Sequence, residues 1–138
     1  MKSDRGSVTI WMLGLSVLLL LFGGLAIDFW RALALQRELA AVADSAAVAA
    51  ASGIDEEHYR LTGEVILERD RVHALAASSV AAQGMDLSIV AVSVSRDLQS
   101  VTVHIEDRLD LGLLGVFVDQ AEPFLIGSKA TAEPRFSP

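Results

Sequence analysis

VTIWMLGLSVLLLLFGGLAI, residues 8–27, is a run of twenty positions without a charged side chain. A helix rises about 1.5 Å per residue, so a helix over this run spans roughly the 30 Å hydrocarbon core of a bilayer. The run therefore predicts a transmembrane helix, preceded by a short N-terminal segment at residues 1–7. Trp11 and Trp30, near the two ends of the run, fit the aromatic belts of a membrane interface or ordinary packing.

A removable signal peptide is the alternative to a retained anchor. Small residues occur at the spacing of a cleavage site, as Gly24 with Ala26 and as Ala32 with Ala34. The apolar run is longer than the 7–15 apolar residues usual in a signal peptide, which favours the anchor. Cleavage would instead release a secreted, soluble binding domain.

The charge distribution separates the two parts of the chain. The whole chain carries a formal charge of −7, and the part after residue 27 holds nine basic and seventeen acidic residues. An acidic domain without a basic cluster excludes nucleic acid as the expected partner. Lys2 and Arg5 precede the apolar run, so the positive-inside rule favours an N-terminus in the cytoplasm and a C-terminal domain outside it.

The helix is predicted to continue beyond the membrane edge, through residues 28–53. No proline occurs before Pro123 and no glycine lies between Gly24 and Gly53, so the first stop signal is Gly53. Alanine, leucine, glutamine, arginine and glutamate dominate this stretch and are strong helix formers. At 100° per residue its apolar side chains form one stripe, which includes Leu35, Leu39, Val42 and Ala46.

Residues 54–138 predict a small extracytoplasmic α+β domain. Its expected elements are an acidic loop at 54–60, a short strand at 61–67, a helix from Asp70 to Gly84, a hairpin of strands at 87–95 and 101–106, and a last strand at 124–132. Together they predict a sheet of three or four antiparallel strands with one covering helix, attached to the long N-terminal helix.

The N-terminal region resembles a known family. Asp4-Arg5-Gly6-Ser7, an immediate apolar helix, Asp28 at its far edge, and Leu35-Gln36 followed by ADSAAVAAA at 43–51 are similar to the start of TadE/TadG-like proteins of tight-adherence, Flp-type pilus systems. The resemblance covers roughly residues 4–53. It implies a single-pass protein of the bacterial cytoplasmic membrane that contacts other proteins of a pilus or secretion apparatus.

The departures from pilins favour an accessory role. Processed prepilins resemble one another in having glutamate at the fifth position after the glycine of the cleavage point, whereas Trp11 is fifth after Gly6 here. No acidic residue lies between Gly6 and Asp28, so the buried carboxylate that pairs with a neighbouring subunit is not expected. The chain is also too short for the adhesive domain of longer TadG-like proteins.

Candidate contact residues follow from these patterns. Asp28 is either a partner contact or a solvated edge residue with Arg31 as its i, i+3 neighbour, and the second reading is favoured. Asp44 either receives a partner's hydrogen bond or marks the polar helix face. The apolar stripe is a further candidate. LDLGLLGVFV at 109–118 either closes the core or exposes an apolar patch formed by Leu113, Leu114, Val116 and Phe117.

Nothing in the sequence predicts catalysis. The three histidines, His58, His73 and His104, lack metal-ligand spacing, and the acidic residues near the C-terminus lack the pattern of a calcium loop. No nucleotide-binding or nucleophile motif occurs, and the chain has no cysteine. We therefore expect no cofactor, metal or small-molecule substrate, and a non-enzymatic protein.

Overall fold

The computed structural model describes residues 5–84, 87, 89–109, 112 and 124–135. Its elements follow the order α1 (Arg5–Ala51), α2 (Glu56–Thr62), α3 (Arg69–Ala82), β1 (Ile89–Val94), β2 (Val101–Leu109) and β3 (Phe124–Ala132). The predicted α+β architecture is confirmed: a long apolar helix precedes a small domain with three antiparallel strands. Two short helices accompany the sheet instead of the one that the sequence predicts.

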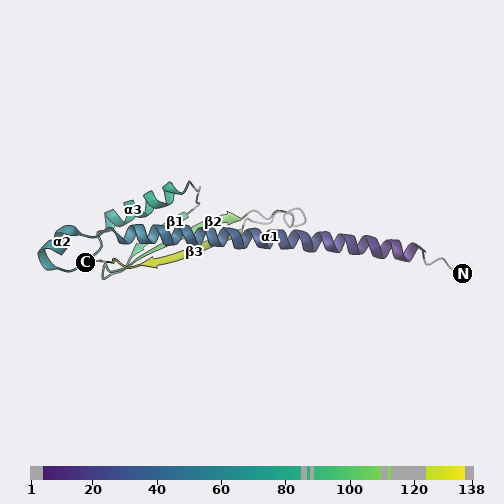
Figure 1. Ribbon diagram of the computed structural model, residues 1–138, viewed down its shortest axis with the longest axis horizontal. Helices are drawn as coiled ribbons and strands as arrows, with labels where there is room; N and C mark the ends of the chain where they lie inside the picture. Colours follow the sequence, from purple (N-terminus) through teal and green to yellow (C-terminus); the bar gives the residue numbers. More distant parts are fainter. Residues whose placement is uncertain (1–4, 85–86, 88, 110–111, 113–123, 136–138) are drawn as a thin grey trace.

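Helix α1 runs without a break through Ile27, where the uncharged run ends. Its 47 residues give a length of about 70 Å. Only its C-terminal half lies against the rest of the domain, while its N-terminal half extends alone (Figure 1). The helix ends at Ala51, as predicted from Gly53. Gly53 is required by a close approach, because a Cβ there would lie 3.0 Å from the backbone nitrogen of Val72.

The sheet has the strand order β1-β2-β3, with both pairings antiparallel. Val101, Val103 and Ile105 point to one face of β2 and are fully buried. The alternating residues face the other side, where the Thr102 and Thr131 hydroxyl oxygens lie 2.8 Å apart. The period-2 pattern of β2 therefore identifies both faces of the sheet, and the strand at 124–132 matches its predicted bounds.

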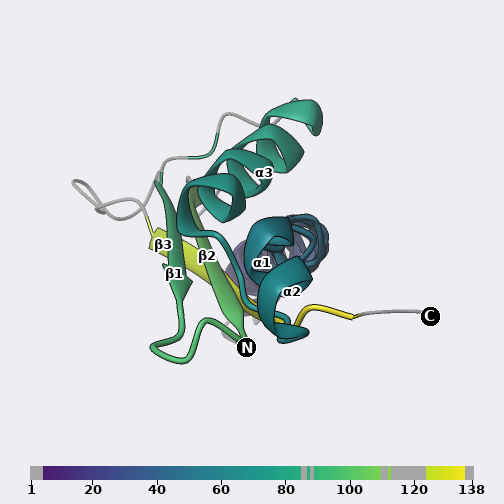
Figure 2. The same ribbon diagram turned by 90° about the vertical axis from the view of Figure 1, so that its left-hand side faces the viewer.

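The core lies between the outer half of α1, the sheet and α3. Seen along α1, the sheet lies on one side of the helix and α3 on another, with α2 near its end (Figure 2). The buried α1 positions recur at i, i+3, i+4 and i+7, and most of them are alanine, which permits close approach of neighbouring backbones. They are Leu39, Val42, Ala43, Ala46, Ala47, Ala50 and Ala51. Leu67, Val72, Ala76 and Val80 complete this core from the α2–α3 side.

Two predictions for residues 54–67 are wrong. The acidic stretch is not a loop but contains α2, because Asp55 caps it by accepting the backbone N–H of His58 at 2.9 Å. The predicted strand at 61–67 is absent, since α2 continues to Thr62 and ends at Gly63, which has a left-handed φ of 76°. Of that stretch, Leu67 forms a single bridge with Ile54.

Helix α3 is confirmed with a different beginning. Its N-cap is Glu68, so Asp70 lies in the first turn and does not cap it. Val72, Ala76 and Val80 are buried as their spacing predicts, and Gly84 with a φ of 67° follows the helix end. In the turn of the β1–β2 hairpin, Leu98 has a positive φ of 59°. Its carbonyl accepts the N–H of Leu67 at 2.9 Å, which ties the turn to the loop before α3.

Candidate interaction surfaces

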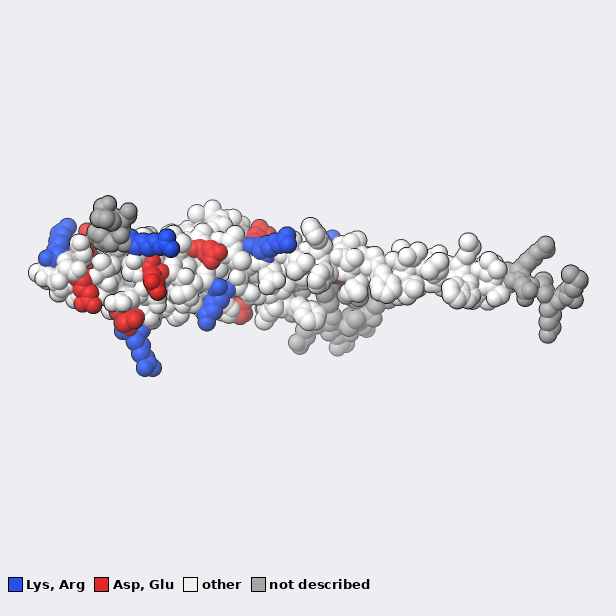
Figure 3. Space-filling view, turned by 60° about the horizontal axis from the view of Figure 1, so that its bottom comes forward, with Lys and Arg blue, Asp and Glu red and all other residues white. Residues whose placement is uncertain are grey.

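The most extensive apolar surface is the N-terminal half of α1. Trp11 and Leu20 are each 75% exposed, and none of the described helices or strands covers the side chains from Val8 to Phe22. Charged side chains gather over the part of the molecule that contains the sheet (Figure 3), whereas the stretch of α1 from Val8 to Ile27 contains none. By length and composition, α1 is able to cross a membrane.

The outer apolar stripe of α1 is used inside the chain. Leu39, Val42 and Ala46, predicted as partner contacts, are at most 1% exposed and belong to the core. Leu35 is partly buried and packs against the same cluster. The stripe therefore attaches the sheet and α3 to the helix, and its surface is not available to a second protein in this fold.

Asp28 lies at the end of the uncharged run and is 5% exposed. Its Oδ1 accepts the backbone N–H of Gly112 at 3.2 Å. A Cβ on Gly112 would lie 2.8 Å from both this oxygen and Nη1 of Arg31, so both side chains pack against that glycine. The favoured reading of Asp28 as a solvated edge residue is wrong, because Asp28 joins α1 to the segment that follows β2.

Asp44 lies on the exposed face of α1, and Val48, one turn further on, is 68% exposed. Between them in sequence, the Ser45 hydroxyl donates to the carbonyl of Val42 at 3.0 Å and accepts a hydrogen bond from the Gln83 side chain. The polar-face reading of Asp44 agrees with this placement. A partner contact at Asp44 stays a prediction.

Val48 also borders a groove of about 700 Å³ between the end of α1 and the end of β3. Its lining combines apolar side chains with a charged rim and comprises Val48, Ala51, Ser52, Ile54, Thr131, Ala132, Glu133, Pro134 and Arg135. Sequence reasoning missed this groove. The local signal was a valine on the otherwise polar face of the helix, whereas the other wall of the groove comes from β3 and the residues after it, which are distant in the sequence.

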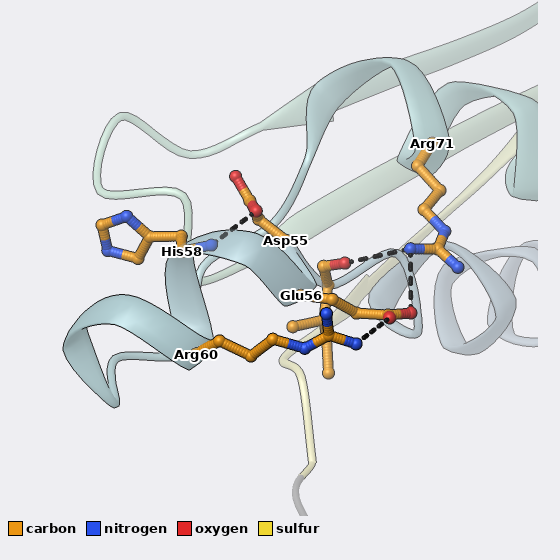
Figure 4. A network of polar contacts seen from close by, with 6 residues as sticks. Asp55, Glu56, His58, Arg60 and Arg71 are labelled. Atoms are coloured by element: carbon orange, nitrogen blue, oxygen red, sulfur yellow. Dashed lines mark hydrogen bonds and ion pairs between the residues drawn. The ribbon is translucent and has the colours of Figure 1, made fainter.

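Polar side chains around α2 form a network beside the groove, which it reaches at Ile54. Glu56 lies 3.8 Å from the Arg60 guanidinium and 3.2 Å from Nη1 of Arg71, which also donates to the Ile54 carbonyl (Figure 4). These side chains are all largely exposed, so each ion pair contributes little stability. The network links α2 to the beginning of α3.

The histidines are distributed over separate elements. His58 is on α2, His73 on α3 and His104 on β2, where its Nε2 lies 3.3 Å from Glu106. Within the described ranges, no three His, Asp or Glu side chains form a group that could hold a metal ion. The pKa of Asp97 is lowered, chiefly because its carboxylate accepts the Ser95 hydroxyl.

The predicted patch in the β2–β3 connection is not placed. Leu113, Leu114, Val116 and Phe117 lie outside the described residues, so this candidate stays a prediction.

Fold and surfaces together define a class of protein in which a long helix, half of it exposed and apolar, leads into a small α+β domain whose core it helps to build. Residues 6–53 match the model of the Tad family, described as Flp pilus-assembly TadE/G-like. The match ends just after α1, and it confirms the resemblance to TadE-like Flp pilus assembly proteins. No curated protein and no solved structure matches the chain. The family match therefore supports a role related to Flp/Tad pilus assembly.

Proposed function

We propose that this protein is a membrane-anchored accessory or minor pilin-like component of a Flp/Tad pilus or secretion apparatus. It acts through protein–protein contacts and does not catalyse a reaction. The observation that carries the proposal is the exposed, uncharged run of α1 at residues 8–27, which lies within the segment that matches the Tad family.

The energetics favour insertion of this half-helix into lipid. Residues 8–27 contain twelve Leu, Ile, Val and Phe residues and no charge. At roughly −0.3 to −0.6 kcal/mol for each such residue at the centre of a bilayer, they supply about −4 to −7 kcal/mol. In water the same side chains would form a large exposed apolar surface, which promotes aggregation.

The proposed topology places the N-terminus in the cytoplasm and the acidic α+β domain outside the cytoplasmic membrane. Lys2 and Arg5 before the span support this orientation. Acidic residues contribute little to the positive-inside rule, so the charge of the domain does not oppose its export.

Contacts with the apparatus are proposed at the outer face of α1 and the adjoining groove. Asp44 and Val48 are exposed there, and the groove beside them is lined by α1, β3 and the residues after each. Trp11 occupies the position where pilins carry glutamate. Polymerisation through a buried glutamate is therefore not part of the proposed role, which favours an accessory or minor component.

The test uses the full chain in a bacterium that assembles Flp pili. We expect the protein to remain in membranes after a carbonate wash, and its domain to be digested by protease added outside the cytoplasmic membrane. Leu18→Arg combined with Leu19→Arg should release it from membranes, whereas Val48→Arg, on the outer half of the same helix, should not. Unprocessed protein that is soluble in the cytosol would overturn the anchor.

Two further measurements test the alternative and the role itself. Mass spectrometry of the mature N-terminus should find the intact apolar run, and a start near Ile27 or Leu35 would instead establish the secreted domain. Deletion of the gene should reduce surface pili in electron micrographs. Val48→Arg should reduce them too if the outer face of α1 contacts the apparatus, and undiminished piliation in both strains would contradict the proposed role.

A further inference from the structure

We propose that the end of the domain nearest the apolar run is a second lipid-contact site, at which the domain rests on the bilayer interface. This membrane-proximal surface consists of Phe29 and Trp30 on α1 and Phe124 and Leu125 at the start of β3. The inference rests on the proposed membrane anchor and adds to it a defined position of the domain on the membrane.

The hydrogen bond between Asp28 and Gly112 determines the position of this surface along the axis of α1. Asp28 directly follows the uncharged run, and its Oδ1 lies 3.2 Å from the Gly112 backbone nitrogen. Gly112 comes three residues after Leu109, the last residue of β2, which pairs with Phe124. Three residues span at most about 10 Å, so the start of β3 is held close to the end of the run.

The other end of β3 confirms the direction of the strand. Thr131 and Ala132 share the groove with Ala51 and Ser52, at the opposite end of the outer half of α1. Strand β3 therefore runs beside α1 from the end of the apolar run outward, as Figure 1 shows. Only its first residues lie near the predicted membrane boundary.

The side chains at this level are apolar and exposed. Phe29 and Trp30 are 63% and 67% exposed, and Phe124 and Leu125 are 60% and 58% exposed. Adjacent strand residues point to opposite faces of a sheet, so the exposure of both Phe124 and Leu125 means that neither face of the strand end is covered. Further along β3, by contrast, Ala130 is buried.

Lipid is the occupant that the surroundings favour. The surface is continuous with the exposed apolar run that is proposed to enter the bilayer, and tryptophan, here Trp30, is enriched where hydrocarbon meets headgroups. Arg31 lies at the same level, and Arg108 pairs in register with Leu125; both are exposed. Arginine side chains at an interface place their stems along apolar surface and their guanidinium groups among phosphates.

Depth-dependent quenching tests the inference on the full chain in liposomes of phosphatidylethanolamine and phosphatidylglycerol. The chain has no cysteine, so single substitutions label one position each. Leu125→Cys carries an environment-sensitive fluorophore at the surface. Lys129→Cys is the matched control, because it is exposed on the same side of β3, about 13 Å further along the strand. Leu19→Cys reports on the anchor.

We expect spin-labelled lipid to quench the label at Leu125 several-fold more strongly than the label at Lys129. Strong quenching at Leu19 with equal quenching at Leu125 and Lys129 would overturn the inference and leave the anchor intact. Absence of quenching at Leu19 would overturn the anchor itself. A label at Leu125 that is shielded only at high protein-to-lipid ratio, without lipid quenching, would identify a second copy as the occupant and also overturn the inference.

Discussion

Replacement of Leu39 by alanine tests whether the outer stripe of α1 is the core of this chain or a surface for another protein. Leu39 is 0% exposed and lies in the cluster that joins α1 to the sheet and α3. Removing three buried carbons costs about 2.4 kcal/mol of transfer free energy, and the remaining cavity raises the total to about 3–4 kcal/mol. That is a large fraction of the roughly 5–15 kcal/mol available to a small domain.

The destabilisation caused by Leu39→Ala is measured by amide hydrogen exchange of β2, with the full chain solubilised in detergent. Exchange at β2 reports on the α+β domain and not on the apolar run at residues 8–27. Val103 is fully buried, so its amide reports opening of the domain. Leu39→Ala should accelerate its exchange by about two to three powers of ten. Val48→Ala is the matched control on the same helix, because Val48 is 68% exposed, and we expect a change within about 0.5 kcal/mol. Unchanged exchange in Leu39→Ala would refute the assignment of the stripe to the core.

Three further substitutions test local features, all by hydrogen exchange or NMR of the full chain. Gly53→Ala should destabilise the domain by about 1–3 kcal/mol, because the new Cβ would lie 3.0 Å from the Val72 backbone nitrogen; wild-type stability would refute the close packing. Asp55→Ala should selectively weaken α2 by about 0.5–2 kcal/mol, and equal loss in α3 would contradict a local cap. The pKa of Asp97 is lowered because the Ser95 hydroxyl donates to its carboxylate. Asp97 therefore stabilises the turn fully at a pH above its pKa in the unfolded chain, and this stabilisation is lost as the pH falls through its lower pKa in the folded chain. Asp97→Asn should remove that acid-side loss in the turn amides, and an unchanged pH profile would refute it.

Periodicity predicted the elements whose burial is one-sided. Strand β2 alternates Val101, Val103 and Ile105 with polar residues, and all three are buried. The same is true of the helical spacing from Leu39 to Ala50. In both cases one face packs on the core and the other meets solvent, so the sequence repeats with the geometry of the element. The strand at 87–95 was instead predicted from its β-branched residues.

The prediction for residues 54–67 was wrong because the charge of this stretch was given more weight than its helix-capping residues. Glu56 and Glu57 suggested a loop, although an acidic first turn stabilises a helix N-terminus. Asp55 as N-cap and Gly63 as left-handed C-cap are helix signals visible in the sequence. Because α2 has no buried residue, it shows no apolar period, and only its caps indicate it.

Neither the contact of Asp28 nor the groove could be predicted from a local sequence pattern, because both depend on segments that are distant in the sequence. Asp28 was interpreted from its neighbours on α1, but its described partner, Gly112, is 84 positions away. The groove likewise joins the end of α1 to the end of β3. A single sequence predicts which residues are apolar or charged, whereas the pairing of distant segments depends on the tertiary fold. The apolar helix was predictable because a continuous run of uncharged residues is itself the signal, and it needs no pairing with a distant part of the chain.

The composition of α1 explains how a helix without a break can have a defined position in the proposed membrane. The helix continues to Ala51, but charged residues such as Arg31 and Arg37 appear only after the uncharged run ends at Ile27. Movement by one turn, about 5.4 Å, toward the cytoplasm would carry Arg31 into hydrocarbon and press the domain, bonded at Asp28, against the headgroups. Movement by one turn outward would bring about four apolar residues into water. In the proposed membrane the helix would therefore be held from both directions, and the Asp28–Gly112 contact would transmit that position to the sheet.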